Sequence, residues 1–186
     1  GFVATTALGN GDNNWWVATL DAIDAQSGAV RSIAKPATQI KHPRVSPDGR
    51  TVAYIGGLMS DYGSIGGDVF TVPLAGGTPT NITAGAKSTV TTLDWTAGGL
   101  RTVTLAGDAT QFGTLVPGKP VAPGFAKPAT ASAGDGRAAF SADGRSVAAV
   151  VQDYEHAPAI YAGPIAAVRQ VTHDNDAAPA LTRAKS

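Results

Sequence analysis

An internal repeat constrains the fold of this chain more than any other feature of its sequence. One segment reads HPRVSPDGRTVAYIGG from His42, another reads RAAFSADGRSVAAVV from Arg137, and a degenerate third between them reads TTLDWTAGGLRTVTLAG. Their second turn residues, Gly49, Gly99 and Gly144, lie 50 and 45 residues apart. Four-stranded propeller blades repeat every ~40–50 residues, and common solenoid repeats are shorter. The spacing therefore favours a β-propeller.

Each clear copy contains the signature of a tight hairpin. Asp48-Gly49 and Asp143-Gly144 stand between two extended runs, and an Asp-Gly pair tolerates the positive φ angles that such turns need. Ser46 and Ser141 precede the aspartates by two residues, so we expect their hydroxyls to bond local backbone groups and close the turn. Both serines are predicted to be structural.

The runs after these turns are apolar without clean alternation, which predicts middle strands covered on both faces. Antiparallel sheets usually leave one face in water, so such strands indicate sheets stacked face to face. The middle strands are expected at Val52–Ile55, Val103–Ala106 and Val147–Val151. Third strands are expected at Asp68–Leu74 and Ala159–Pro164, and outermost strands in the runs ending Asn81-Ile82-Thr83 and Arg169-Gln170-Val171-Thr172.

The sequence predicts an all-β fold, a partial β-propeller of about three to four antiparallel four-stranded blades. No segment has sustained helical spacing of apolar residues. Before the first full copy, Trp15 to Ile23 and Ala29 to Ile33 are expected to be the later strands of a preceding blade, with one more strand from Gly1 to Leu8. We expect the partial propeller over 1–176, with blades at about 1–40, 41–86, 87–127 and 128–176, and an exit linker at 177–186.

Composition excludes several classes of function. Lys and Arg number 14, as do Asp and Glu, so no basic field would attract nucleic acid or an anionic membrane. The absence of cysteine removes thiol nucleophiles and thiolate metal sites. No apolar run approaches the ~20 residues of a membrane span. These features leave the cytoplasm and the periplasm of a bacterium equally open as locations.

Three segments carry a family resemblance: SPDGRTVAYIGG, GGDVFTVPLAGGTPTNIT and YEHAPAIYAGPIAAVRQVTHDN. With NNWW from Asn13 and IGGLMSD from Ile55, they resemble the propeller of prolyl-oligopeptidase-family serine peptidases, in particular the bacterial dipeptidyl-aminopeptidase and acylaminoacyl-peptidase type. The resemblance implies a parent chain in which an α/β-hydrolase domain with the catalytic triad follows the propeller. It also implies that the propeller admits only short or flexible peptides, and that this chain alone is inactive.

The residues themselves point to no catalytic, metal or cofactor site. A nucleophile elbow needs Gly-x-Ser-x-Gly before a helix, and the nearest approach, around Ser64, has Tyr62 in place of the first glycine. The histidines are isolated in sequence and are expected on the surface or in turns, and the tryptophans are expected to pack between blades. The candidates for touching a substrate, each weighed against a solvated loop, are Asp61, Tyr62, Asp68, Glu155 and His156.

Two hypotheses about function follow. The first is a non-catalytic propeller segment that gates access of short peptides to the hydrolase domain of a serine exopeptidase. The alternative is a Tol-like or WD-like propeller that acts as a protein-interaction scaffold, because fold alone does not determine function. An incomplete ring would in either case expose blade faces and strand edges, which predicts self-association.

Overall fold

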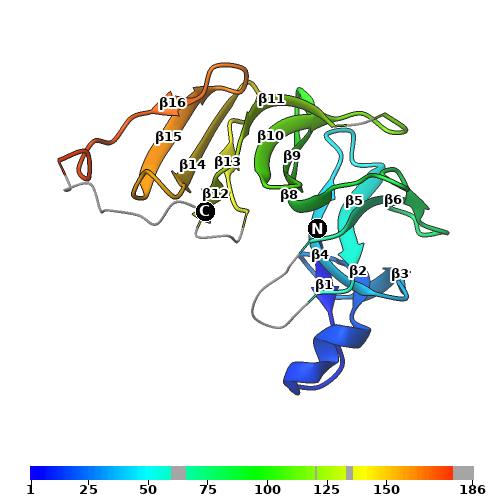
Figure 1. Cartoon of the computed structure of the whole chain (residues 1–186). Helices are drawn as coiled ribbons and strands as arrows, with labels where there is room; N and C mark the ends of the chain where they lie inside the picture. Colours follow the sequence, from blue (N-terminus) through cyan, green and yellow to red (C-terminus); the bar gives the residue numbers. More distant parts are fainter. Residues whose placement is uncertain (60–65, 120, 133–135, 178–186) are drawn as a thin grey trace.

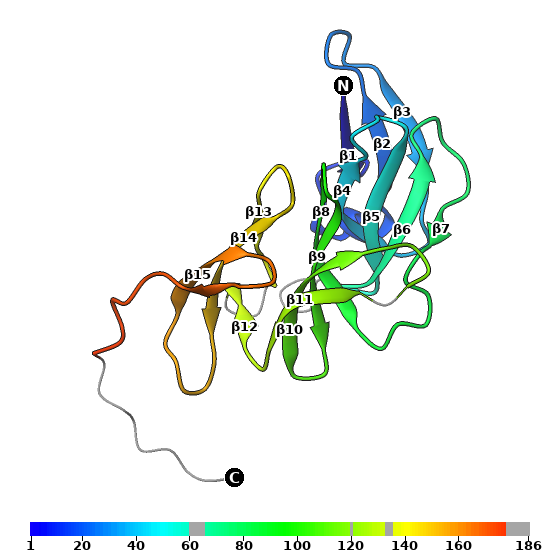
Figure 2. The same ribbon diagram turned by 90° about the horizontal axis from the view of Figure 1, so that it is seen from above.

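The computed structural model describes residues 1–59, 66–119, 121–132 and 136–177, which form four antiparallel sheets in sequence order along an arc (Figures 1 and 2). The first sheet contains β1 (Phe2–Thr6), β2 (Thr19–Ile23) and β3 (Val30–Ala34). The second contains β4 (Gln39–Val45), β5 (Thr51–Gly57), β6 (Asp68–Pro73) and β7 (Thr80–Asn81). The third contains β8 (Thr89–Thr96), β9 (Gly99–Ala106), β10 (Ala109–Leu115) and β11 (Ala122–Lys127). The fourth contains β12 (Thr130–Ala131), β13 (Ala139–Phe140), β14 (Ser146–Gln152), β15 (Ala159–Pro164) and β16 (Arg169–Gln170).

The predicted all-β partial propeller is confirmed, with one difference in strand number. The sheets contain three, four, four and five strands rather than four each. The fifth strand arises because β12 and β13 both pair with β14 and together fill one strand position. Within the described ranges no α-helix is present, and no helix there is long and apolar enough to cross a membrane. Of the predicted linker at 177–186, only residue 177 lies within the described residues.

Three apolar cores hold the sheets together, one between each pair of neighbours. The core between the first and second sheets contains Leu20, Ile33, Ala34, Ile40, Val52, Tyr54 and Val72. The core between the second and third contains Ala53, Ile55, Met59, Val69, Ile82, Val90, Leu93, Leu100 and Leu115. The core between the third and fourth contains Val103, Phe112, Phe125, Ala129, Ala131, Val147, Ala149 and Val151. Each middle sheet therefore buries both of its faces, as blades of a propeller do.

The middle strands bear out the sequence pattern in two of three cases. Val52 to Ile55 in β5 are fully buried, and alternate residues enter different cores. In β9, Val103 and Thr104 are likewise fully buried, whereas Leu105 and Ala106 are half-buried. In β14 the prediction is wrong, because Val147, Ala149 and Val151 are buried but Val150 is exposed. The fourth sheet stands at the end of the arc, where no further sheet in the described part of the chain covers its second face.

The two Asp-Gly corners have the predicted geometry. Gly49 and Gly144 have φ angles of 72° and 69°. The Ser46 hydroxyl donates to Asp48 Oδ1 at 2.5 Å, and the Ser141 hydroxyl donates to Asp143 Oδ1 at 2.6 Å. In the degenerate copy, the loop between β8 and β9 is only two residues long, so Gly99 is the first strand residue, with a φ of 106°. All three glycines lie between the first and second strands of their blades or at the start of the second, but Gly99 begins its strand, whereas Gly49 and Gly144 lie in the loop before theirs.

The segment before β2 corrects one prediction. Trp15 and Trp16 were expected on a strand, but Asp12–Val17 forms the 3-10 helix η1 in the connection from β1 to β2. The two rings meet edge to face at 6.4 Å. Trp15 packs against the core between the second and third sheets, as predicted for a packing residue, while Trp16 is exposed.

The arrangement of the strands defines an inner side of the arc. β4 and β8, the first strands of their sheets, contact one another. β1 and β2 contact β4 just as β5 and β6 contact β8, so the first sheet supplies the second to fourth strands of its blade. The inner side is therefore formed by β4, β8 and the β12–β13 segment (Figure 2).

Candidate functional site

Charged side chains from three sheets meet on this inner side. Arg44 of β4 and Asp94 of β8 form an ion pair, with 3.1 Å between Arg44 Nε and Asp94 Oδ1. The same carboxylate oxygen accepts the backbone N–H of Trp95 at 3.0 Å. The carboxylate is therefore held from both sides, and the pair joins the second and third sheets.

His42 lies in a bulge of β4, where the register shifts between Lys41 and Arg44. Its φ angle is 52°, a conformation uncommon for residues other than glycine and often found where a side chain is redirected. Pro43 follows and has no N–H to pair with β5, which suits the bulge. The sequence interpretation of His42 as a surface or turn residue is therefore wrong, because it is half-buried within a strand.

The environment keeps the His42 imidazole neutral. Burial, and after it the positive charges of Lys41, Arg44 and Arg137, together lower the pKa of His42 to about 4, against the opposing effect of Asp94. Desolvation and nearby like charge both disfavour the protonated ring. Its Nδ1 atom is buried and has no hydrogen-bond partner among the described residues.

The fourth sheet contributes Arg137 through a fixed backbone segment. The hydroxyls of Thr91 and Thr92 both donate to the Gly136 carbonyl, at 2.9 and 2.8 Å. Gly136 has a φ of 64°, and a Cβ there would lie 2.2 Å from Thr91 Oγ1, so only glycine fits. We call Lys41, His42, Arg44, Asp94 and Arg137 the inner-strand cluster. Among the described residues it has three cations, one carboxylate and a neutral imidazole.

This cluster can bind and orient polar or charged groups. Within the described part of the chain, the serine side chains that make hydrogen bonds pair with Asp24, Asp48 and Asp143 or with backbone groups, and none pairs with a histidine. The described part of the chain also contains no group of three or more His, Cys, Asp or Glu side chains that could hold a metal ion. The chemistry that the cluster supplies is electrostatic recognition.

The three predicted substrate-contacting residues that lie within the described ranges, Asp68, Glu155 and His156, do not converge. Asp68, at the start of β6, accepts hydrogen bonds from Asn81 Nδ2 at 2.7 Å and from the Thr83 hydroxyl at 3.2 Å, within its own sheet. Glu155 and His156 lie in the exposed loop between β14 and β15, two sheets away. Asp61 and Tyr62 lie outside the described residues, as does Ser64.

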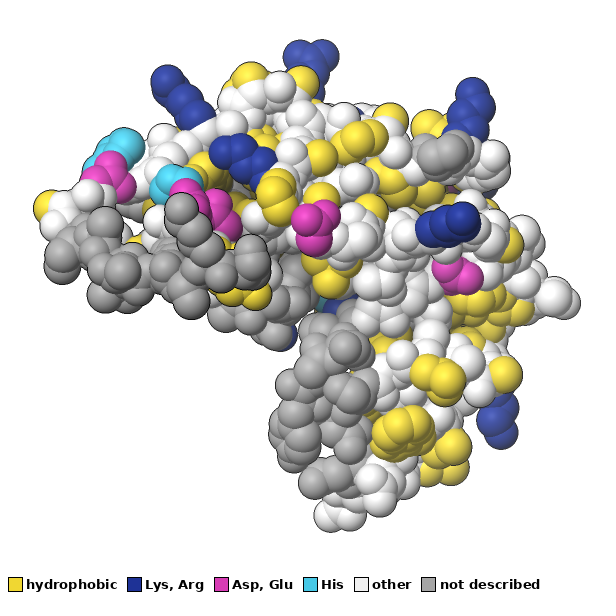
Figure 3. Space-filling model, in the orientation of Figure 1, with side chains coloured by type: hydrophobic (Ala, Val, Ile, Leu, Met, Phe, Trp, Pro, Cys, Tyr) yellow, Lys and Arg dark blue, Asp and Glu magenta, His cyan; other side chains and the backbone are white. Residues whose placement is uncertain are grey.

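The loop of Glu155 and His156 is organised by Asp153. Its carboxylate accepts the backbone N–H groups of both residues, at 2.8 and 2.7 Å, and bonds His156 Nδ1 at 2.8 Å. Burial raises the pKa of Asp153, but these hydrogen bonds outweigh burial and the pKa is lowered. A second pair, His173 and Asp176, lies at 2.7 Å after β16. Figure 3 shows such histidine–carboxylate pairs on the surface formed by the fourth sheet.

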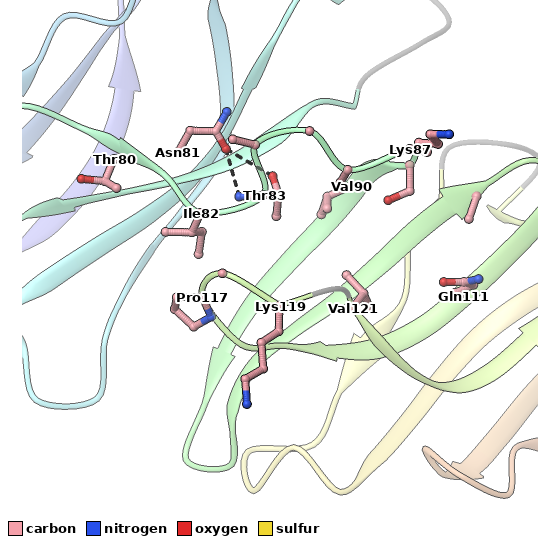
Figure 4. Close-up of a pocket in the computed structure, with 16 residues that line it drawn as sticks. Thr80, Asn81, Ile82, Thr83, Lys87, Val90, Gln111, Pro117, Lys119 and Val121 are labelled. Atoms are coloured by element: carbon pink, nitrogen blue, oxygen red, sulfur yellow. Dashed lines mark hydrogen bonds between the residues drawn. The ribbon is translucent and has the colours of Figure 1, made fainter.

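A cleft of about 770 Å³ lies between the second and third sheets, away from the inner-strand cluster. Its walls are the crossover from β7 to β8 and the turn from β10 to β11 (Figure 4). Most lining side chains are small or apolar, including Ile82, Val90, Pro117 and Val121. The Asn81 side chain accepts the backbone N–H of Thr83 at 2.9 Å. Two lysines, Lys87 and Lys119, also line the cleft, and in Figure 4 Lys119 extends away from the crossover.

Comparison with solved structures places the chain among β-propeller proteins. Puromycin hydrolase matches over 91% of this chain and 28% of its own, with a TM-score of 0.68 and 15% identity. Oligogalacturonate lyase in complex with manganese matches over 85% and 43%, with a TM-score of 0.66 and 19% identity. Acylaminoacyl peptidase of Pyrococcus horikoshii matches over 91% of this chain and 30% of its own, with a TM-score of 0.54 and 17% identity. TolB from Acinetobacter baumannii matches over 84% of this chain and 38% of its own, with a TM-score of 0.59 and 17% identity.

These likenesses establish the fold, and they include the peptidase class that the sequence resembles. The chain spans less than half the length of each of these four structures. A comparison with known protein families finds no match, and no curated protein matches the sequence.

Proposed function

We propose that this chain is the non-catalytic propeller segment of a serine exopeptidase, where it controls which peptides reach an α/β-hydrolase domain. The observation that carries the proposal is the inner-strand cluster, which concentrates charge on the side of the blades that a substrate in a propeller channel would pass. The peptidase propellers matched over 91% of the chain support it.

The chemistry of the cluster suits a selective passage for peptides. Lys41, Arg44 and Arg137 place positive charge around His42, and the Arg44–Asp94 pair fixes two inner strands relative to one another. A charged lining with low-dielectric walls raises the local concentration of oppositely charged ligands and repels those of like charge. Peptides with acidic side chains or a free carboxyl end would thus be favoured over basic ones.

A first experiment tests the missing catalytic apparatus. The 186-residue chain, purified free of other proteases, is offered dipeptidyl and acylaminoacyl chromogenic substrates, and no turnover is expected. The gene downstream of Ser186 should encode an α/β pattern with Gly-x-Ser-x-Gly. Turnover by the isolated chain would contradict the proposal, as would a stop codon directly after Ser186.

A second experiment tests selection by the cluster in the longer chain. Arg44→Gln removes a charge from the inner side, and Arg145→Gln removes one from an exposed turn as the control. We expect kcat/KM for an acidic peptide to fall relative to a matched neutral peptide in Arg44→Gln only. Equal ratios in both variants would exclude a selective role for the cluster.

The second candidate function, an interaction scaffold, is favoured by the exposed apolar residues on the fourth sheet. Val150, Ile160 and Val171 are each at least 40% exposed, and contiguous exposed apolar surface marks protein contacts. The likeness to TolB supports this alternative at the level of the fold. The downstream gene sequence discriminates, because a scaffold needs no hydrolase domain.

A further inference from the structure

The connection from β1 to β2 contains an asparagine followed by a glycine, Asn10-Gly11. In such a pair the backbone nitrogen of the second residue can attack the side-chain amide carbon of the first and close a five-membered ring. Glycine favours the attack because it has no Cβ to obstruct it and leaves the backbone free to turn. Whether the pair reacts in a folded chain depends on whether hydrogen bonds restrain either group.

Both reacting groups of this pair are free in the described part of the chain. The connection projects beyond the sheets (Figure 1), and residues 9–11 are exposed and lie outside helices and strands. The Asn10 amide and the Gly11 N–H take part in none of the hydrogen bonds among the described residues. Gly9, with a φ of 78°, precedes them, so Asn10 stands between two residues whose backbones lack the constraint of a side chain.

The other four asparagines of the chain lack this freedom. The backbone N–H that would attack Asn13, Asn81 or Asn175 already donates to a carbonyl, at 2.9, 2.9 and 3.2 Å respectively. Asn14 donates its own side-chain amide to a backbone carbonyl, and a tryptophan follows it. Among the asparagines, the structure therefore leaves both groups free at Asn10 alone.

The fold does not require glycine at position 11. Gly11 has a φ of -79° and a ψ of 136°, a conformation open to any residue. A Cβ there would lie 3.7 Å from Asn14 Nδ2, an ordinary van der Waals distance. Gly49 and Gly144 differ, because their φ angles are positive and their N–H groups each donate to a serine carbonyl at 2.8 Å. Gly11→Ala thus changes the chemistry of the pair without straining the fold.

We propose that Asn10 is a site of spontaneous covalent modification, at which the chain converts its own asparagine into aspartate and isoaspartate. The Gly11 nitrogen bonds to Asn10 Cγ, the bond from Cγ to the side-chain nitrogen breaks, and the proton of the Gly11 N–H ends on the leaving ammonia. Water then opens the succinimide ring at either carbonyl. One water is consumed for each ammonia released and no atom changes oxidation state, so no other reactant is needed.

The product changes both the charge and the length of the connection that carries η1. Each event adds one negative charge to a chain that is formally neutral. In the isoaspartyl product the main chain runs through the side-chain carbons of residue 10 and is one carbon longer. The added carbon falls between the carbonyls of Leu8 and Gly11, which Asn14 holds through its side-chain and backbone N–H groups. We expect one of these bonds to break and Trp15 to loosen from the core between the second and third sheets.

The first test follows the 186-residue chain during prolonged incubation in neutral buffer made with heavy-oxygen water. Peptide mapping by mass spectrometry should find the label first at residue 10, and ion exchange should resolve a more acidic form. Asn13, Asn81 and Asn175 in the same digest are internal references. Gly11→Ala should slow labelling at residue 10 several-fold, and circular dichroism checks that this variant is folded. An unlabelled Asn10, earlier labelling of another asparagine, or an equal rate in Gly11→Ala would overturn the proposed site.

The second test examines the effect of the longer main chain on η1. The isoaspartyl form, separated by ion exchange, is compared by tryptophan fluorescence with the fresh chain and with Asn10→Asp, which carries the new charge on a normal backbone. We expect emission to shift to longer wavelength in the isoaspartyl form only. An unchanged emission, or an equal shift in Asn10→Asp, would overturn the effect of chain length on η1. None of these measurements uses peptidase activity, so the proposed function stands or falls separately.

Discussion

The guanidinium of Arg101 donates through Nε to the backbone carbonyl of Gly144 at 2.7 Å, which joins the third sheet to the Asp-Gly corner of the fourth. Its Nη1 donates to the Thr114 hydroxyl at 2.8 Å. Arg101 is only 8% exposed. A buried charge needs hydrogen-bonding partners to offset its desolvation, and here a carbonyl and a hydroxyl supply them.

Loss of Arg101 is therefore expected to destabilise the fold. Arg101→Ala removes two charge-assisted hydrogen bonds and the packing of the side-chain stem, so the free energy of unfolding should fall by about 2–4 kcal/mol. The measurement is urea unfolding followed by circular dichroism. Arg145→Ala is the control, because that side chain is 86% exposed and its loss should change stability by less than about 0.5 kcal/mol.

The two Asp-Gly corners provide a matched pair of glycines. Gly49 has a φ of 72° with open space around its missing Cβ, whereas a Cβ on Gly144, at 69°, would lie 2.2 Å from Thr96 Oγ1. Gly49→Ala should cost about 1–2 kcal/mol for the left-handed conformation alone. Gly144→Ala should cost about 1–3 kcal/mol more, because overpacking adds to it. Equal losses in thermal unfolding would contradict the close approach of Thr96.

The corner serines should affect both stability and acid titration. Ser46 is buried and accepts the Thr51 N–H at 3.0 Å, so Ser46→Ala should cost about 1–2 kcal/mol, and Ser141→Ala, at the more exposed corner, about half of that. The Ser46 hydroxyl, followed by the Arg50 N–H, lowers the pKa of Asp48 below its ordinary value of 3.8.

The sign of the acid effect follows from that lowered pKa. Stability from the ionised Asp48 is fully present above pH 3.8 and is lost as the pH falls through the folded-state pKa. In Ser46→Ala the pKa of Asp48 should return toward 3.8, and stability should depend less on pH below that value. Carboxyl NMR titration measures the change, and an unmoved Asp48 pKa would argue against the hydrogen bond.

The lowered pKa of His42 predicts that the free energy of unfolding also depends on pH in a second, higher range. Its pKa falls from 6.5 to about 4 on folding, so the unfolded chain binds a proton in this interval that the folded chain does not. Stability should fall as the pH drops from 6.5 to 4, by up to about 3 kcal/mol from this group. His42→Asn tolerates positive φ and should flatten that slope in urea unfolding at several pH values. An unchanged slope would mean that His42 is protonated in the folded chain.

Local sequence patterns predict most of the fold. The pairs Asp48-Gly49 and Asp143-Gly144 predict the turns, and the apolar runs after them predict the strands that follow. The strand prediction for Trp15 and Trp16 is wrong because two adjacent apolar residues resemble a strand, whereas here they lie in a 3-10 helix from which Trp15 packs on the core between the second and third sheets. The burial predicted for Val150 is wrong because the apolar run of β14 resembles that of the covered strand β5. Whether such a strand is covered depends on a neighbouring sheet, which the local sequence does not specify.

The candidate site was much less predictable. Lys41, Asp94 and Arg137 are far apart in sequence and meet only because three inner strands lie side by side. One signal was available: in the repeat alignment, His42 and Arg137 begin equivalent copies, so two polar residues share one inner-strand position. The bulge that turns His42 into the cluster depends on Pro43 and on the register with β5, which no local pattern specifies.

The outermost strands β7 and β16 are two residues long, and beside each a threonine hydroxyl takes the place of a backbone acceptor. Such stubs expose few free amide groups, so they offer a poor template for strand addition from another molecule. Growth at the rim of these two sheets is thereby discouraged, and aggregation of the amyloid type should begin elsewhere.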